Sequence, residues 1–378
     1  MSSNTSEQRV GIAIVGTGGM GSIHADCYAR HEGFELIGFQ NRTVEKAEVL
    51  AEKYGGHVFK TIDAVLDEDS IQAVNISTTQ TIHTQQVVAA AEAGKHIFCE
   101  KPLALTTEEL DEIERAASVS GKAFVVGHQL RYHPVINVVR ENLNRLGPCY
   151  HLDLEWTLLI RDTGGRCWGS YREGGFLMEL GAHVCDLARY LFGEVVDLSG
   201  YTLRINPERV TEDYSNVLLQ FENGAVGSIL VSANHRTERQ GLIQGRALGR
   251  DGRIDFTAYP FSRDFNEATL TIDHGKELFI PDVTTVSLDI PERPCPHEDY
   301  EGFYDVYDQE ADDFLNAIRT GSAPRCTLED GRRAVEMVLA TYHHQGLASD
   351  RKNFANPPSE YRSDADCHPL LKGIEEEG

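Results

Sequence analysis

The stretch Val10-Gly-Ile-Ala-Ile-Val-Gly16-Thr-Gly18-Gly-Met-Gly21 decides the fold of this 378-residue chain. Its first six residues are almost all apolar, which is typical of a short strand covered on both faces of a parallel sheet. A glycine-rich loop follows at once, and a helical pattern then continues to about His31. A strand, a G-x-G-x-x-G loop and a helix in this order predict a site for a dinucleotide.

Each glycine of this loop has a distinct physical role. Gly16 permits the tight turn, Gly18 lets the backbone approach a pyrophosphate, and Gly21 allows the helix to pack closely on the strand. The helix N-terminus adds amide donors and a partial positive charge for the phosphates. A merely structural glycine-rich turn is the alternative, and the placement between strand and helix argues against it. The predicted phosphate-binding residues are Gly16, Gly18, Gly19, Met20 and Gly21.

Strands and helices alternate from this unit to about residue 127, and the pattern then changes. The spacing predicts a Rossmann domain, a doubly wound parallel sheet with helices on both faces. After residue 148 the chain alternates polar and apolar residues, with hairpin turns at Asn223-Gly224 and Asp251-Gly252. This half predicts an α/β domain with a large, mostly antiparallel open sheet. Its expected strands are 150–160, 195–204, 213–222, 225–233, 241–248 and 268–280, and its expected helices are 176–192, 305–319 and 328–345.

Length and composition limit the organisation and the partners. At 378 residues two domains are expected, at 9–130 and 131–350, between a disordered leader at 1–8 and a C-terminal arm at 351–378. Lys and Arg number 35 against 59 Asp and Glu, and this net charge of −24 argues against a nucleic-acid partner. Eight scattered cysteines without a C-x-x-C pair favour reduced thiols. With no membrane-spanning run and no secretory signal, the expected location is cytoplasmic.

A second segment with functional character ends the strand predicted at 96–99. Apolar residues run into Glu100-Lys101-Pro102, and the proline fixes the turn. In open α/β sheets, ligands bind beyond the carboxyl ends of the strands, where Lys101 would lie. A surface Glu–Lys pair is the common alternative, but the glycine-rich loop upstream and a third segment downstream indicate the same cleft.

The choice between the two nicotinamide cofactors depends on Gln40-Asn41-Arg42-Thr43, at the end of the second predicted strand. NAD-binding proteins usually carry an acidic residue there. Asn41 removes the charge that would repel a 2′-phosphate, Arg42 can pair with that phosphate, and Thr43 can donate a hydrogen bond. The alternative is an Arg42 that faces solvent or stacks on adenine in an NAD enzyme. We expect NADP, with NAD as the alternative.

The third segment begins at Gly174-Gly175 and continues as a predicted helix. Glu179, His183 and Asp186 are spaced i, i+4, i+7, so they share one helix face. An imidazole beside carboxylates suits general acid–base catalysis, although a solvated polar stripe explains this segment equally well. Two metal ligands are also conceivable, but no further His or Cys group has the spacing of a closed site, so no metal is expected.

These segments, taken in order, resemble the Gfo/Idh/MocA oxidoreductase family, which includes glucose–fructose oxidoreductase and inositol dehydrogenase. The resemblance covers roughly residues 10–345. It implies a Rossmann domain and an α/β domain whose open sheet often forms a homodimer or homotetramer. It also implies reversible hydride transfer between NAD(P) and a hydroxyl of a sugar or polyol. Flanking pieces that match are Ser77-Thr78-Thr79, His83, 127–134, 311–321 and 328–331.

The resemblance also implies roles for individual residues. Lys101 would hold the reacting oxygen and lower its pKa, and His183 would be the general base towards the alcohol. Glu179 stands where Asp is usual, and its extra methylene could move the carboxylate by about 1 Å. Thr78, Thr79, His83, Glu100, Lys101 and Gln129 would line the cofactor. Substrate contacts are expected from Lys101, Glu179, His183, Arg131 and Trp168.

Two other functions are compatible with the same resemblance. Some members hold the cofactor tightly and cleave a glycosidic bond without net redox change, and a yeast regulator of sugar use has a similar fold. Such a regulator need not keep catalytic groups, so the presence of both Lys101 and His183 favours an enzyme. The substrate itself is not encoded in any of these patterns.

Overall fold

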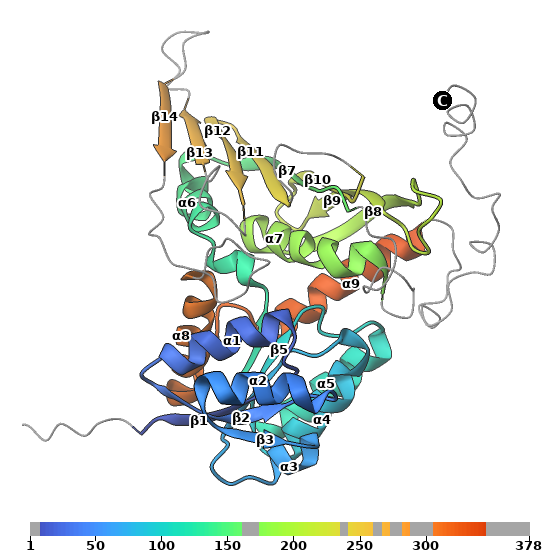
Figure 1. Cartoon of the computed structure of the whole chain (residues 1–378). Helices are drawn as coiled ribbons and strands as arrows, with labels where there is room; N and C mark the ends of the chain where they lie inside the picture. The colour runs from blue at the N-terminus through green and yellow to red at the C-terminus, as the bar shows by residue number, and fades with distance from the viewer. Residues whose placement is uncertain are drawn as a thin grey trace, which may run out of the picture. The chain divides into compact units, whose positions relative to one another are not determined.

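The computed structural model describes residues 8–160, 174–234, 241–259, 267–272, 282–287 and 305–344. Within these residues the chain forms two compact units (Figure 1). The first comprises residues 8–104, 108–132 and 305–332, and the second comprises 105–107, 133–287 and 333–344 outside the gaps just given. None of the described helices is long and apolar enough to cross a bilayer.

The first unit contains a six-stranded parallel sheet in the order β3-β2-β1-β4-β5-β6. This confirms the predicted doubly wound parallel sheet, and the order places the glycine-rich loop after the central strand β1. Strand β1 is buried along its whole length, which explains its unbroken apolar run. The strands are β1 (Val10–Val15), β2 (Phe34–Gln40), β3 (His57–Phe59), β4 (Ala73–Ile76), β5 (His96–Glu100) and β6 (Phe124–Gly127).

Helices follow the strands of this sheet, as the alternating pattern predicted, with a few short additions. The strand β3 and the helix α3 were not predicted, since three and five residues are too few to show a period. The helices and single turns are α1 (Gly19–Arg30), α2 (Val44–Tyr54), α3 (Ile62–Leu66), η1 (Gln80–Ile82), α4 (His83–Glu92), α5 (Thr107–Ser120) and η2 (Gln129–Tyr132).

Helix α8 (Asp305–Thr320) packs in the first unit, although its sequence position led us to expect it in the second domain. Phe314 is fully buried, and its ring centroid lies 6.1 Å from those of both Phe34 and Phe98. At the surface, Arg30 of α1 forms an ion pair with Asp308 at 2.9 Å. The apolar face of α8 therefore completes the core of the first unit.

The second unit contains an eight-stranded sheet in the order β14-β13-β12-β11-β7-β10-β9-β8. Neighbouring strands are antiparallel except β7 and β10, which confirms the mostly antiparallel sheet. Two strands were not predicted: β12, which follows the predicted turn at Asp251-Gly252, and β14. The strands are β7 (Cys149–Thr157), β8 (Val195–Leu203), β9 (Tyr214–Phe221), β10 (Val226–Ser232), β11 (Leu242–Gly249), β12 (Gly252–Ala258), β13 (Glu267–Ile272) and β14 (Asp282–Ser287).

One face of this sheet is covered by helices, as Figure 1 shows for α6 and α7. In β9, Val217 and Leu219 are buried on the covered face, whereas Leu218 between them is 60% exposed on the other. This alternation is the period of two that the sequence displayed. The helices of the unit are α6 (Pro134–Asn142), the 3₁₀ turn η3 (Leu143–Leu146), the π turn η6 (Leu177–Gly181), α7 (Ala182–Phe192) and most of α9 (Leu328–His344).

Candidate active site

The glycine-rich loop has the geometry expected of a phosphate cradle. Gly16 has φ +96°, and a Cβ there would lie 2.5 Å from the carbonyl oxygen of Ser77. A Cβ at Gly21 would overlap the Gly16 carbonyl, so helix and loop approach more closely than any side chain would allow. A Cβ at Gly18 would meet nothing within 4 Å, so the backbone faces open space where α1 begins. A phosphate group fits such a place.

The end of β2 is tied to this loop through Asn41. Its amide nitrogen donates to the Thr17 hydroxyl at 2.8 Å, and its oxygen accepts from the Thr43 amide at 2.9 Å. Arg42 and Thr43 are exposed beside it. Within the described parts of the chain, no hydrogen bond or ion pair engages the Arg42 guanidinium, so that group is available to an anion.

The predicted residues after β4 lie together with the turn after β5. His83 is buried, and its ring nitrogens lie 2.9 Å from the carbonyl oxygen of Pro102 and 3.2 Å from that of Thr78. A neutral imidazole carries one N–H, so it donates to one of these carbonyls at a time. Thr78 donates to Gln86 at 2.6 Å, and Thr79 lies 3.2 Å from the Thr81 hydroxyl. His83 thus holds the two turns together.

Glu100 anchors the backbone at Lys101 from inside the first unit. Its carboxylate is 2.8 Å from Nε2 of His24 on α1, and it accepts from the Lys101 amide at 3.2 Å. Burial by itself would raise the pKa of Glu100, but the hydrogen bond from His24 and the charge of Lys101 hold that pKa below its usual value. An ionised carboxylate is therefore fixed directly behind Lys101.

A second buried carboxyl group, which our sequence interpretation did not include, lies on α8 in the same unit. Glu310 is 1% exposed, and among the described residues neither of its oxygens has a hydrogen-bond partner. Burial, followed by the charges of Glu100 and Asp313, raises its pKa well above the usual value. A single acidic residue on an amphipathic helix carries no sequence signal of such burial.

Residues of η2 are more deeply engaged than the substrate prediction assumed. Gln129 is 7% exposed, so its side chain is almost fully enclosed in the protein. Arg131 is also buried: its guanidinium donates to the Arg325 carbonyl at 2.7 Å and pairs with Asp330 at 2.9 Å. These bonds join η2 to Arg325 and to the first turn of α9, so Arg131 helps to hold the first unit together, and its contact with the substrate stays a prediction.

In the second unit, the segment predicted to carry acid–base groups begins at two glycines with positive φ, +100° at Gly174 and +81° at Gly175. His183 is 3% exposed, and its ring centroid lies 5.3 Å from that of Trp156 on β7. Asp186 is fully buried, and Glu179 is partly exposed. The segment thus presents one accessible carboxylate, at Glu179.

The predicted continuous helix at 176–192 is in fact a π turn at Leu177–Gly181 followed by α7. A π turn contains one more residue per hydrogen-bonded ring than an α-helix, so the angle between Glu179 and His183 differs from the regular i, i+4 value. Gly181 permits this arrangement, because a Cβ there would collide with the Leu177 side chain. Such turns occur frequently at functional sites.

Two further expectations concern a tryptophan and a metal ion. Trp168, the remaining expected substrate contact, lies outside the described residues. Among the residues that are described, no group of three or more His, Cys, Asp and Glu side chains is arranged to hold a metal ion.

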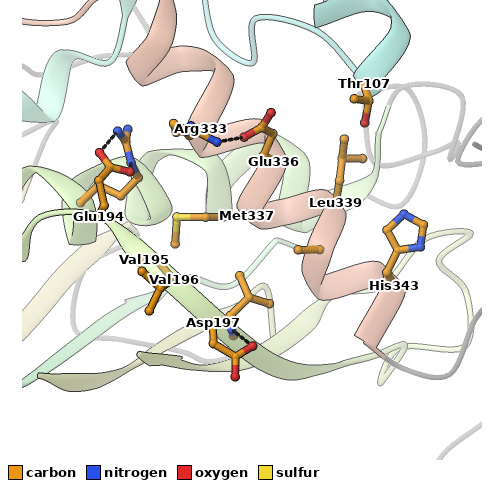
Figure 2. Close-up of a pocket in the computed structure, with 13 residues that line it drawn as sticks. Thr107, Glu194, Val195, Val196, Asp197, Arg333, Glu336, Met337, Leu339 and His343 are labelled. Atoms are coloured by element: carbon orange, nitrogen blue, oxygen red, sulfur yellow. Dashed lines mark hydrogen bonds and ion pairs between the residues drawn. The ribbon is translucent and has the colours of Figure 1, made fainter. Parts of the chain in front are cut away.

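A separate pocket of about 410 Å³ in the second unit contains none of the predicted site residues. Figure 2 shows Glu194 and Asp197 on one side of it and Arg333, Glu336 and Met337 of α9 on the other. Each of its two arginines is paired with a carboxylate, Arg333 with Glu336 at 2.7 Å and Arg189 with Glu194 at 2.5 Å. These cations are therefore neutralised within the pocket, and we assign it no ligand.

Comparisons with known proteins match both halves of the chain. Residues 10–128 match a family model described as the oxidoreductase family with an NAD-binding Rossmann fold. Residues 166–345 match one described as the C-terminal alpha/beta domain of the same oxidoreductase family.

Several of the similar individual proteins are dehydrogenases. D-apiose dehydrogenase of Paraburkholderia graminis is 24% identical over 89% of this chain and 88% of its own. The scyllo-inositol 2-dehydrogenase (NAD(+)) of Bacillus subtilis is 27% identical over 88% of this chain and 93% of its own. A solved structure, levoglucosan dehydrogenase in complex with NADH, has a TM-score of 0.78 at 24% identity and covers 90% of this chain and 97% of its own. This structural likeness shows the same fold.

Proposed function

The chain belongs to the Gfo/Idh/MocA oxidoreductase family, and from this premise we propose that it transfers a hydride between a nicotinamide cofactor and a secondary hydroxyl or ketone of a sugar, polyol or sugar derivative. The observation that carries the proposal is the anchored Glu-Lys-Pro segment, where a buried, ionised Glu100 fixes the backbone of Lys101 at the carboxyl end of β5. Ligands bind at this end of the strands in open α/β sheets.

The first unit fits a nicotinamide dinucleotide. The open space at Gly18 and the free start of α1 would receive the pyrophosphate, and the residues around His83 would line the cofactor. When bound, the nicotinamide supplies the hydride donor or acceptor. The ammonium group of Lys101 would hold the reacting oxygen and stabilise negative charge on it.

The second unit would supply the proton acceptor. His183 would take the hydroxyl proton during oxidation and return it during reduction. Glu179 would contact the substrate and orient it for this proton transfer. The substrate class is taken from relatives whose names specify apiose and inositol, together with the levoglucosan dehydrogenase structure. The panel of sugars and polyols described below would identify the specific substrate within that class.

We further propose NADP as the preferred cofactor. The exposed Arg42 and Thr43 support this, because a 2′-phosphate would gain a guanidinium partner and a hydroxyl donor. Asn41 supports it as well, since a neutral amide tied to Thr17 replaces the carboxylate that repels such a phosphate.

We also propose that the open face of the eight-stranded sheet joins two or four copies of the chain. This face contains the exposed Leu218, the ion pair between Arg246 and Asp255 at 2.6 Å, and the bond from Ser228 to Asp153 at 2.6 Å. Light scattering should give a dimer or tetramer that Leu218→Asp dissociates. Val119→Asp, at a site 85% exposed on α5, is the control and should change nothing. A monomeric wild-type protein would refute this interface.

The expected location is the cytoplasm. The five cysteines within the described residues are free thiols, and this suits a reducing compartment.

The direct test of the function is nicotinamide absorbance with a panel of sugars, inositols and nucleotide sugars, in the presence of NAD or NADP. We expect turnover on one polyol class that Lys101→Ala abolishes. No turnover with either cofactor, together with nicotinamide released on denaturation, would replace this proposal with redox-assisted glycoside cleavage.

A further inference from the structure

A buried carboxyl group holds the start of the segment that carries Glu179 and His183. Glu212 lies just before β9, and its side chain is 2% exposed. Its Oε1 accepts a hydrogen bond at 2.9 Å from the backbone amide of Leu177, the first residue of the π turn. All of these residues belong to the second unit.

Gly175, the second of the two glycines before the π turn, packs directly against this carboxyl group. A Cβ at Gly175 would lie 2.6 Å from Oε2 and 2.7 Å from Oε1 of Glu212, so only a glycine lets the backbone pass there. Both glycines also have positive φ, which other residues rarely adopt. The sequence singled out Gly174 and Gly175 as the start of the segment, and Glu212 accounts for the second of them.

Tyr342 of α9 connects the carboxyl group to the first glycine. Its hydroxyl oxygen lies 2.5 Å from Oε1 of Glu212 and 3.0 Å from the carbonyl oxygen of Gly174. A hydroxyl carries one proton, so it donates fully to one of these acceptors at a time. Which acceptor receives that proton depends on whether Glu212 is itself protonated.

The two protonation states give two different hydrogen-bond arrangements. A neutral Glu212 donates its proton to the Tyr342 oxygen, and Tyr342 then donates to the Gly174 carbonyl. An ionised Glu212 requires the Tyr342 proton for itself, so Gly174 loses that donor. The bond from the Leu177 amide persists in both states, and the difference is therefore confined to the turn at Gly174.

The surroundings of Glu212 bring its pKa into the pH range in which enzymes are ordinarily assayed. Burial raises the pKa of Glu212 to about 7, against the hydrogen bonds from Tyr342 and the Leu177 amide, and with a smaller contribution from Asp213. Among the described residues, the titratable groups that shift its pKa are Tyr342 from α9 and Asp213 from its own segment. Asp213 in turn accepts from the Ile205 and Asn206 amides at 2.7 and 2.9 Å and pairs with Arg209 at 3.5 Å.

We propose that Glu212 and Tyr342 form a proton-dependent latch, closed when Glu212 is neutral, that holds the Gly174 turn at the start of the segment carrying Glu179 and His183. Both are positioning residues, because they act through the backbone of that segment. The effect of the latch on turnover rests on the proposed function, whereas its effect on the Gly174 turn does not. The test therefore needs one measurement that requires no substrate.

That measurement is amide hydrogen exchange of the peptide covering residues 174–181, expressed as protection factors at pH 6 and pH 8. In the wild-type protein we expect protection to fall roughly fivefold at pH 8, the value of one ordinary hydrogen bond. Glu212→Gln, which mimics the neutral acid, should keep the high protection at both pH values. Tyr342→Phe should show the low protection at both.

Matched controls are available in exposed residues of the same unit. Glu222→Gln and Tyr201→Phe remove the same groups from the surface and should behave as the wild-type protein. Equal protection of the wild-type segment at pH 6 and pH 8, or a Glu212→Gln variant that still loses protection, would overturn the latch. If Tyr342→Phe does not fold, the comparison of wild type with Glu212→Gln decides alone.

Turnover separates the latch from the proposed function. Where a substrate is found, the wild-type kcat should fall roughly three- to tenfold as the pH rises through 7, with KM changed less, and Glu212→Gln should lose that decline. An exchange response without turnover on any sugar or polyol would uphold the latch and refute the function. Turnover without an exchange response would uphold the function and refute the latch.

Discussion

Glu100 in the first unit and Glu212 in the second are both buried carboxyl groups behind a candidate catalytic segment, yet their pKa values are shifted in opposite directions. Burial acts upward on both. Glu100 also receives a hydrogen bond from His24 and lies beside Lys101, and together they reverse the shift. The donors that Glu212 has among the described residues are neutral, namely the Tyr342 hydroxyl and backbone amides including that of Leu177, and they do not reverse the shift. The charge of the partner therefore decides whether a buried carboxylate is a fixed anion or a proton acceptor.

Glu310 extends this comparison to a group with neither kind of partner. It is buried like the other two, and the charged groups that shift its pKa are the carboxylates Glu100 and Asp313. With only like charges among the causes of its shift and no hydrogen bond among the described residues, its pKa is raised well above the usual value and it stays neutral. A neutral Glu310 adds no charge next to the ionised Glu100.

The largest expected effect concerns the residue that Glu100 supports. Lys101→Ala should lower kcat roughly 10³-fold, because the charge on the reacting oxygen loses its cation. Steady-state kinetics on the substrate identified by the panel would measure it, with Lys122→Ala on the surface of the same unit as control. A decrease of less than tenfold would mean that Lys101, which Glu100 supports, does not stabilise the reacting oxygen.

The next effect tests whether Glu100 depends on its hydrogen bond with His24. His24→Ala should reduce the free energy of unfolding at pH 7 by roughly 3 kcal/mol, because it leaves a buried carboxylate without its partner. Urea denaturation would measure the loss. The matched variant is His31→Ala, which removes a more exposed ion pair, with Asp312 at 2.9 Å, and should cost about 1 kcal/mol or less. Equal losses would contradict the proposed difference between the two pairs.

The two carboxyl groups should also give stability profiles of opposite slope. The folded-state pKa of Glu212 is raised, so its contribution is complete below about pH 4.5 and is lost as the pH rises through about 7. Relative to Glu212→Gln, the wild-type protein should therefore lose about 3 kcal/mol over that range.

The folded-state pKa of Glu100 is lowered, so its contribution is present above the ordinary carboxyl pKa and is lost as the pH falls. Relative to Glu100→Gln, the wild-type protein should become more stable as the pH rises. Unfolding free energies of the three proteins between about pH 3 and pH 8 would measure both slopes, that of Glu100 below about pH 4.5 and that of Glu212 between about pH 4.5 and 7. Slopes of the same sign would show that the pKa values of Glu100 and Glu212 are not shifted in opposite directions.

The smallest expected effect lies at the surface, where solvent weakens every charge. Arg42→Ala should raise the KM for NADP about tenfold and leave the KM for NAD nearly unchanged, since only NADP carries the 2′-phosphate. Arg115→Ala, an exposed arginine on α5, is the control. Equal changes for the two cofactors would show that Arg42 does not distinguish them.

The sequence by itself determined the features that depend on near neighbours in the chain. The apolar run of β1, its glycine-rich loop, the alternation after it and the Gly174-Gly175 turn are all local patterns, so they could be identified without coordinates. The same holds for the period of two in the second sheet. Strands β3, β12 and β14 were missed because they are short or follow directly on a turn.

Only the tertiary structure decided which residues far apart in the chain share an environment. Phe314 packs α8 into the first unit, the Leu177 side chain lies where a Cβ at position 181 would be, and Arg131 pairs with Asp330. Burial raises the pKa of Glu212, and this rise is opposed by hydrogen bonds from Tyr342, 130 residues after it, and from Leu177, 35 residues before it. The physical reason is that periodicity indicates only which face of an element is buried, whereas a charge depends on every group packed around it.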